Sequence, residues 1–296
     1  MKIAKRILLF VSVNILIVAT ISVVMSLLGV QPYLTKQGIN YQSLMLFCVI
    51  WGFGGAFISL MLSRVMAKWM MGVKLISPQS SDPDAKDLLK RVHSFAARAG
   101  LKVMPEVGIY ESDEINAFAT GPTKNRSLVA VTTGLLQKMN RNEVDGVLAH
   151  EIAHIANGDM VTMTLVQGVV NAFVMFLARV AAFFVAQLVD EERRGVVQFV
   201  VVLALEILLG ILGMIIVASF SRRREFRADE GGARLSGKDN MIAALERLKA
   251  NLNLQNKDDQ SSLATLKIYG RKGSFLSLFS THPDLDLRIK HLRTTI

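Results

Sequence analysis

Cysteine is almost absent from the sequence. Cys48 is the only one among 296 residues, and it lies inside a long apolar run. A single cysteine can form neither an intramolecular disulfide nor a cysteine-based zinc site. The near-absence of cysteine is consistent with a protein whose functional region faces a reducing compartment.

Nucleotide-binding and nucleic-acid-binding motifs are also missing. No G-x-x-x-x-G-K-[ST] loop, the motif that binds ATP phosphates, occurs, which excludes ATP-driven unfolding by this chain. The net charge of +10 has two explanations. Nucleic-acid binding is one, but no zinc-knuckle spacing, aromatic-interleaved basic stretch or recognition motif is present. The other is a membrane protein with basic flanks, and the apolar residues, 51% of the chain, are gathered in blocks that favour it.

The first two apolar blocks predict a transmembrane hairpin. Residues 7–29 and 43–63 are each long enough to cross a hydrocarbon core of ~30 Å. The first run is longer than the core of a signal peptide and ends without a cleavage site, so we expect an uncleaved anchor. Three glycines of the second run, at 52, 54 and 55, could allow close helix packing. Basic residues on both flanks predict that the N-terminus and the region after residue 64 face the cytoplasm; they are Lys2, Lys5, Arg6, Arg64, Lys68 and Lys74.

Two later apolar runs carry charged residues. Arg179 interrupts the run at 163–189, and Glu206 interrupts the run at 196–220. A charge inside a bilayer is costly, so such residues normally pair with each other or face a cavity. A structural pair, a polar cavity and a hairpin that only partly enters the bilayer all fit the sequence.

The stretch "AHEIAHIANGD" holds the clearest chemical motif. His150 and His154 lie one helical turn apart, so they can present two imidazoles to one metal ion. Glu151 is then placed as the general base for a water molecule. Asn140, followed by Glu143, predicts the start of this helix. An ordinary helix with two surface histidines is the alternative.

A catalytic zinc site needs a third protein ligand. Asn157 and Met160 exclude the metzincin extension, which requires glycine and histidine there. The candidates that remain are Asp159, Glu225 and Asp229. Asp159 is too close in sequence to reach the metal from another direction. The other two share one face of a separate helix, which fits one metal ligand and one acceptor for an imidazole N–H, but also an ordinary charged helix.

These motifs together resemble the HtpX family of bacterial membrane zinc metallopeptidases, which is similar to the zinc-type CAAX prenyl proteases. The resemblance covers nearly the whole chain and rests on the segments "GFGGAFISLMLS", "DEINAFATG", "SLVAVTTGLL", "AHEIAHIANGDMVTMTLVQGVVN", "SRRREFRAD", "MIAALERLK" and "THPDLDLRI".

The resemblance implies roles for individual residues. Glu225 would be the third ligand of one Zn²⁺ per chain, and Asp229 would support a ligand imidazole. His282, in an "HPD" segment, would stabilise the oxyanion, although a histidine before proline is otherwise an ordinary loop residue. The edge strand of the cleft would bind substrate backbone through Asn116, Ala117 and Phe118. Without the resemblance, "NAFATG" predicts only a strand that ends in a Gly-Pro turn.

The expected fold is α+β and mainly helical, with multi-pass membrane helices and a cytoplasmic gluzincin-like protease domain that carries a small β-sheet. A helix is predicted at 84–99, after a linker at 77–86, strands near 106–111, 116–120 and 127–132, and helices from about 133. The predicted segments are an N-terminal hairpin at 1–64, protease regions at 65–160 and 222–296, and a second hydrophobic hairpin at 161–221.

The expected function is ATP-independent endopeptidase activity at the bacterial inner membrane. The implied substrates are misfolded or damaged membrane proteins, with the lipid bilayer as the other partner and neither nucleic acid nor nucleotide involved. Processing of CAAX-like or other specific substrates is one alternative. A non-catalytic zinc regulator is another, although Glu151 argues against it. A transporter fits poorly with four spans and a large soluble insert.

Overall fold

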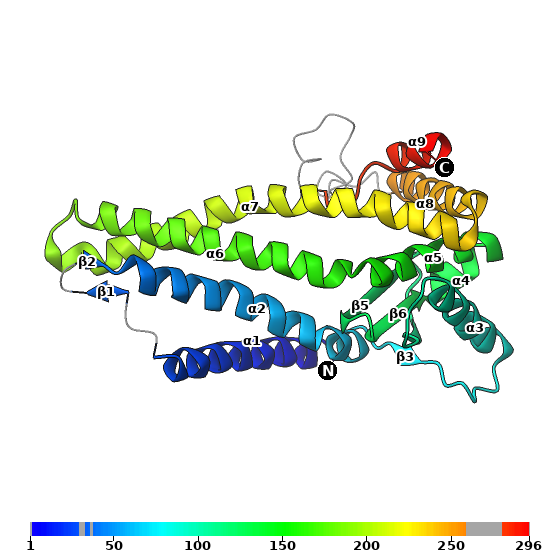
Figure 1. The fold of residues 1–296 in the computed structure, drawn as a ribbon, viewed down its shortest axis with the longest axis horizontal. Coiled ribbons are helices and arrows are strands. Elements are labelled where there is room, and N and C mark those ends of the chain that lie inside the picture. The colour runs from blue at the N-terminus through cyan, green and yellow to red at the C-terminus, as the bar shows by residue number, and fades with distance from the viewer. Residues whose placement is uncertain (1, 30–32, 36–37, 259–279, 296) are drawn as a thin grey trace. The chain divides into compact units, whose positions relative to one another are not determined.

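The computed structural model describes residues 2–29, 33–35, 38–258 and 280–295 (Figure 1). The chain divides into two compact units, and each is built from two separate stretches of sequence. The first unit combines Met1–Leu60 with Met163–Val217, and the second combines Met61–Thr162 with Ala218–Ile296.

The first unit is built from long apolar helices. In the described residues, three helices are long and apolar enough to cross a membrane, namely α2, α6 and α7. The side chains of α1 are described from Ile15, and Ile15–Leu27 forms a shorter apolar helix. The elements that contribute to this unit are α1 (Lys2–Leu27), β1 (Leu34–Thr35), β2 (Gly38–Ile39), α2 (Tyr41–Met70), α6 (Asp159–Ala186) and α7 (Glu191–Ser236).

Glycine allows α2 and α6 to pack closely. A Cβ atom on Gly52 would lie 2.7 Å from the backbone nitrogen of Ala172 and 2.9 Å from the carbonyl oxygen of Gly168, so no larger residue fits there without a shift of the helices. A Cβ on Gly54 would lie 3.2 Å from side-chain carbons of Ile21 in α1, whereas one on Gly55 would meet none of the described residues within 4 Å. Close packing therefore depends on two of the three glycines that the sequence singled out.

The two interrupting charges of the apolar runs form an ion pair. Arg179 Nη1 lies 2.5 Å from Glu206 Oε1, which joins α6 to α7. The guanidinium also donates to the carbonyl oxygen of Met175 and lies 5.2 Å from the centre of the Phe47 ring. Pairing lowers the cost of placing either charge in an apolar medium, so the contact agrees with a structural pair.

The second unit is a four-stranded sheet covered by helices. The strand order is β3–β4–β6–β5, with β4 and β6 parallel and the other two pairs antiparallel. β5 is therefore an edge strand. The elements of this unit are β3 (Lys74–Leu75), α3 (Pro83–Arg98), β4 (Glu106–Tyr110), β5 (Ala117–Thr123), β6 (Arg126–Thr132), α4 (Thr133–Lys138), α5 (Arg141–Asn157), α8 (Lys238–Asp258) and α9 (Leu285–Thr295), together with the ends of α2, α6 and α7.

The core of this unit forms around α5. Its apolar face packs against β6 and α3, where the buried residues include Leu148, Ile152, Val129, Val131 and Val92. The predicted cap is confirmed, because the side chain of Asn140 accepts from the backbone N–H of Glu143 while the Glu143 carboxylate accepts from the N–H of Asn140. This central, capped helix fixes the positions of the residues that it carries.

One local prediction differs from the structure. The strand at 116–120 does not end at Gly121–Pro122 but continues to Thr123, with a bulge after Thr120. Gly121 permits this because its φ of +142° is a conformation that other residues rarely adopt. The segment boundaries predicted at 64/65, 160/161 and 221/222 lie within a few residues of the divisions between the two compact units, inside α2, α6 and α7.

Candidate metal centre and catalytic cleft

Helix α5 directs His150 and His154 to the same side, as their spacing predicts. Both are 8% exposed. The last part of α7 approaches α5 closely because two glycines face it. A Cβ on Gly231 would lie 2.7 Å from the Cβ of Ala153, and one on Gly232 would lie 3.1 Å from the backbone nitrogen of His150. This close approach brings the carboxylates of α7 to the histidines.

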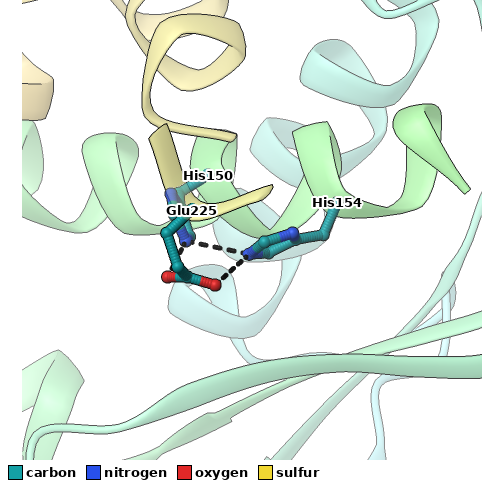
Figure 2. A group of neighbouring side chains, drawn as sticks. All are labelled: His150, His154 and Glu225. Atoms are coloured by element: carbon teal, nitrogen blue, oxygen red, sulfur yellow. Dashed lines mark hydrogen bonds and ion pairs between the residues drawn. The ribbon is translucent and has the colours of Figure 1, made fainter. Parts of the chain in front are cut away.

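Glu225 meets both imidazoles (Figure 2). The Nε2 atoms of His150 and His154 lie 3.0 Å apart, and they lie 3.5 Å and 3.4 Å from the two carboxylate oxygens of Glu225. One donor atom from each residue can be chosen so that all three lie within 4.8 Å of one another. Two imidazoles and one carboxylate around a common point are the protein ligand set of many catalytic zinc sites.

An aspartate carboxylate lies next to the Nδ1 atom of each histidine. His154 Nδ1 forms a hydrogen bond of 2.6 Å with Asp159 Oδ2, whereas His150 Nδ1 lies 2.9 Å from Asp229 Oδ1 at ion-pair distance without hydrogen-bond geometry. A carboxylate at Nδ1 favours the tautomer that carries its proton there, which leaves the Nε2 lone pair directed toward Glu225. The two histidines are thus oriented as metal ligands by a pair of aspartates, both almost completely buried.

The carboxylate of Glu225 is fully buried, and its two oxygens differ in surroundings. Oε2 accepts a hydrogen bond from His282 Nδ1 at 2.8 Å and lies 3.4 Å from Arg288 Nη1. Oε1 has only longer contacts within the described residues, to His154 Nε2 at 3.4 Å and to Arg224 Nε at 3.8 Å. A buried carboxylate oxygen with contacts of this length can still bind a cation, so this site fits a metal ion.

The electrostatics of the site couple the histidines to the carboxylates. Burial lowers the pKa of His154, but the hydrogen bonds to Asp159 and Glu225 outweigh burial and raise the pKa to about 9. The pKa of His150 is also raised, since the bonds to Asp229 and Glu225 outweigh its burial. Burial raises the pKa of Asp229, but the Arg288 guanidinium and His150 hold that pKa below its usual value.

Arg288 and His282 bring the C-terminal part of the chain to the site. Arg288 forms a two-pronged contact with Asp229, with N–O distances of 2.7 Å and 2.6 Å. The Nδ1 atom of His282 lies 2.8 Å from Glu225 Oε2, and the oxyanion role expected for this histidine stays a prediction. Its side chain is 55% exposed and also borders the cavity described next.

A cavity of about 520 Å³ opens beside the metal group. Glu151 lines it together with His150 and Glu225, so the predicted base and two of the three candidate ligands face one space. Asn116 and Ala117 also line it. The remaining predicted substrate residue does not, because side chains alternate along β5 and Phe118 points to the opposite face of the sheet, where its ring lies 5.7 Å from that of Tyr110.

Two functional residues were missed by sequence reasoning. Asp159 was set aside as too close to His154 to ligate the same metal, but that closeness lets it support the imidazole. The left-handed Gly158, with φ of 73°, ends α5 and turns the chain so that the aspartate can return. Arg288 lies in the "THPDLDLRI" segment, and the only sequence signal for it was its place six residues after His282.

Comparisons with known proteins agree with this geometry. The sequence model that describes Peptidase family M48 matches residues 82–296 of this chain. A protease HtpX homolog of Bacillus velezensis is 52% identical over 295 residues, which cover 98% of this chain and 99% of the relative. The protease HtpX of Shewanella piezotolerans is 51% identical over 297 residues, covering 98% and 100%.

The fold is also similar to the crystal structure of Ste24p from S. mikatae, with a TM-score of 0.64 and 19% identity. That likeness covers 98% of this chain and 64% of the Ste24p chain, and it concerns the fold alone. The apolar helices and these relatives identify a multi-pass membrane metallopeptidase. The chain therefore belongs to peptidase family M48 and, within it, to the HtpX proteases.

Proposed function

We propose that the chain is an ATP-independent zinc endopeptidase of the bacterial inner membrane, which hydrolyses misfolded or damaged membrane proteins. The observation that carries the proposal is the convergence of His150, His154 and Glu225, two of which line an open cavity together with Glu151. The two nitrogen donors and one oxygen donor suit Zn²⁺, and three protein ligands leave a position for water or substrate. When bound, zinc supplies the Lewis acidity that activates water and polarises the substrate carbonyl.

The residues of the chain have separate tasks in this proposal. Glu151 accepts the proton of the attacking water and then delivers it to the leaving amine. Asp159 and Asp229 keep the two ligand imidazoles in their orientation and tautomer. The edge strand β5 pairs its outer side with an extended substrate, beginning at Ala117. Asn116, whose backbone N–H and carbonyl are both bonded to Thr132, contributes its side chain.

An extended backbone is the feature that damaged proteins share, and this supports the proposed substrates. Pairing with an edge strand uses main-chain groups, so it accepts many sequences provided that the segment is unfolded. The basic flanks of the apolar segments support an arrangement with the N-terminus and the catalytic unit in the cytoplasm.

The test compares full-length wild type with Glu151→Gln, both purified in detergent and loaded with zinc. We expect equal zinc content, because Glu151 is not a ligand, and loss of casein cleavage in the variant. Glu111→Gln is the matched control, since this glutamate is 84% exposed at its side chain and lies after β4, away from the cavity. A Glu151→Gln protein that cleaves casein at the wild-type rate would refute the assigned base.

A further inference from the structure

Two segments of the second unit lie side by side at one end of its sheet. Strands β4 and β6 are parallel, with Glu106 opposite Leu128, so the loop before β4 runs beside the turn between β5 and β6. A cavity of about 430 Å³ between them is lined by residues 100–102 of the loop and 123–125 of the turn. We call these two segments, residues 99–105 and 123–126, the rim of the sheet.

One side of the rim adjoins the end of α2. Glu106, the first residue after the loop, lies 2.5 Å from Arg64 Nη2 and 2.8 Å from Lys68 Nζ. Arg64 is the first residue after the apolar run at 43–63. Basic residues directly after a membrane span lie at the level of the lipid headgroups. The start of β4 is therefore held close to the bilayer surface.

The other side of the rim adjoins the start of α6. Lys124 donates from Nζ to the carbonyl oxygen of Ala156, and its Cε would lie 3.3 Å from a Cβ on Gly158. Gly158 directly precedes α6, whose apolar run begins at residue 163. At 1.5 Å per residue, this stretch of helix spans only about 8 Å. Two independent contacts, one with each membrane helix, thus place the rim near the bilayer surface.

The rim carries both cationic and exposed apolar side chains. Lys102 of the loop and Arg126 of the turn are exposed, and neither forms a hydrogen bond or ion pair with another described residue. Between them in the same loop, Val103 is 46% exposed and Met104 is 37% exposed. Apolar side chains that can enter the headgroup layer, flanked by cations that attract anionic lipid, are typical of a membrane-binding surface.

Arg126 lies on the face of the sheet that the end of α2 covers. Side chains alternate along β6, so Arg126, Leu128 and Ala130 share one face. Leu128 and Ala130 form a buried cluster with Ala67, in the part of α2 that follows its apolar run. The described lining of the cavity that holds Glu151 includes no residue of the rim. Lipid contact at the rim and substrate binding in that cavity therefore use different surfaces.

We propose that the rim binds anionic phospholipid headgroups of the bilayer through Lys102 and Arg126, while Val103 and Met104 enter the layer between headgroups and acyl chains. Charge complementarity and the contacts with α2 and α6 identify this partner. Such a contact fixes the orientation of the second unit relative to the bilayer. The proposal goes beyond the proposed function, because it requires the membrane helices but no particular substrate or metal.

The expected size of the effect follows from the two cations. Each basic residue close to an anionic bilayer favours the contact by roughly five-fold, so replacing both Lys102 and Arg126 by glutamine should shift the contact equilibrium toward water by roughly 25-fold. In a neutral bilayer the wild type should behave like this double variant. The contribution of the cations should also fall in 1 M salt, where the Debye length is about 3 Å.

The experiment places one nitroxide label at the rim of the full-length protein. Cys48 is the only cysteine, so Met104→Cys in a Cys48→Ala background carries a single label. The protein is reconstituted in nanodiscs of phosphatidylcholine alone or of equal parts phosphatidylcholine and phosphatidylglycerol. Electron paramagnetic resonance then measures collisions of the label with oxygen, which concentrates in lipid, and with a nickel chelate, which stays in water. We expect oxygen collisions to dominate only in the anionic nanodiscs.

Matched controls lie at the other end of α3. Ser81→Cys carries the control label, because this exposed residue precedes α3 and the helix spans about 24 Å from there to the rim. Lys86→Gln with Lys90→Gln is the control for charge, since both lysines are exposed on α3. Every variant is first compared with wild type for its thermal transition in detergent.

Each outcome bears on the rim and none depends on peptidase activity. A Met104→Cys label that stays in water in anionic nanodiscs overturns the proposal, and Val103→Cys repeats the measurement at the neighbouring position. Equal contact in neutral and anionic bilayers, or contact that persists in Lys102→Gln with Arg126→Gln, overturns the role of the headgroups. An equal loss in the α3 charge control, or lipid contact of the Ser81→Cys label, overturns the assignment to the rim. Contact that is lost only in the rim variant supports it.

Discussion

Replacing Asp159 by asparagine changes the charge behind one metal ligand and little else. The carboxylate is 3% exposed at its side chain and lies 2.6 Å from His154 Nδ1. Asparagine keeps an oxygen that can accept the same hydrogen bond but removes the negative charge that makes the imidazole a stronger base. Asp229 is less suitable, because its replacement would also leave the buried Arg288 without its main partner.

Loss of such a supporting group typically lowers metal affinity by about 10–100-fold. For Asp159→Asn we expect the lower end, about 10-fold or ~1.4 kcal/mol, because the hydrogen bond survives. For Asp159→Ala we expect about 100-fold or ~2.7 kcal/mol, because His154 loses its orientation as well.

The assay is competition for zinc between the detergent-purified protein and a chromogenic chelator at fixed pH. Asp190→Asn is the control, since this exposed aspartate directly precedes α7 just as Asp159 begins α6. Zinc affinity of Asp159→Asn within two-fold of wild type, or an equal loss in Asp190→Asn, would refute the support that we assign to Asp159.

Three further predictions concern other parts of the chain. The pKa of His154 is about 9, and its protonated form cannot bind metal. Zinc affinity should therefore fall as the pH is lowered from 8 to 6, by roughly 10-fold per pH unit for each proton displaced. A zinc affinity that does not change with pH in the chelator assay would contradict this prediction. Gly52→Val should destabilise the protein in detergent by about 1–3 kcal/mol, whereas Gly55→Val should not, because only Gly52 lies against the backbone of α6. Arg179→Met should lower the free energy of unfolding by ~2.5–3.5 kcal/mol, because it leaves Glu206 unpaired. The double variant with Glu206→Leu should regain most of the thermal stability. Equal stability of the single and double variants would argue against the ion pair.

Local features of the catalytic helix were predictable from the sequence. The capping residues and the apolar stripe located α5, and helical spacing alone required His150 and His154 to face the same way. The orientation of Phe118 was predictable too, because strand alternation separates it from Ala117. A contact of the Phe118 backbone with substrate stays a prediction, because pairing with an edge strand uses main-chain groups.

Long-range contacts could not be derived from spacing. The sequence left Glu225 and Asp229 open as candidates, and only the family resemblance distinguished them. Their contact with α5 depends on the close approach that Gly231 and Gly232 permit, which is a property of two packed helices and not of either sequence segment. The contact of Arg288 with Asp229 likewise joins α9 to α7, and no local pattern marks it.

The C-terminal supports of Glu225 also determine when the site can form during synthesis. His150 and His154 are made early, but the partners of the buried Glu225 and Asp229 carboxylates include His282 and Arg288. A nascent chain that has not yet extended past Arg288 would hold two buried anions without these cationic or donor groups. Because Glu225, His282 and Arg288 all follow the last apolar run, the described geometry needs residues that are made after the apolar helices.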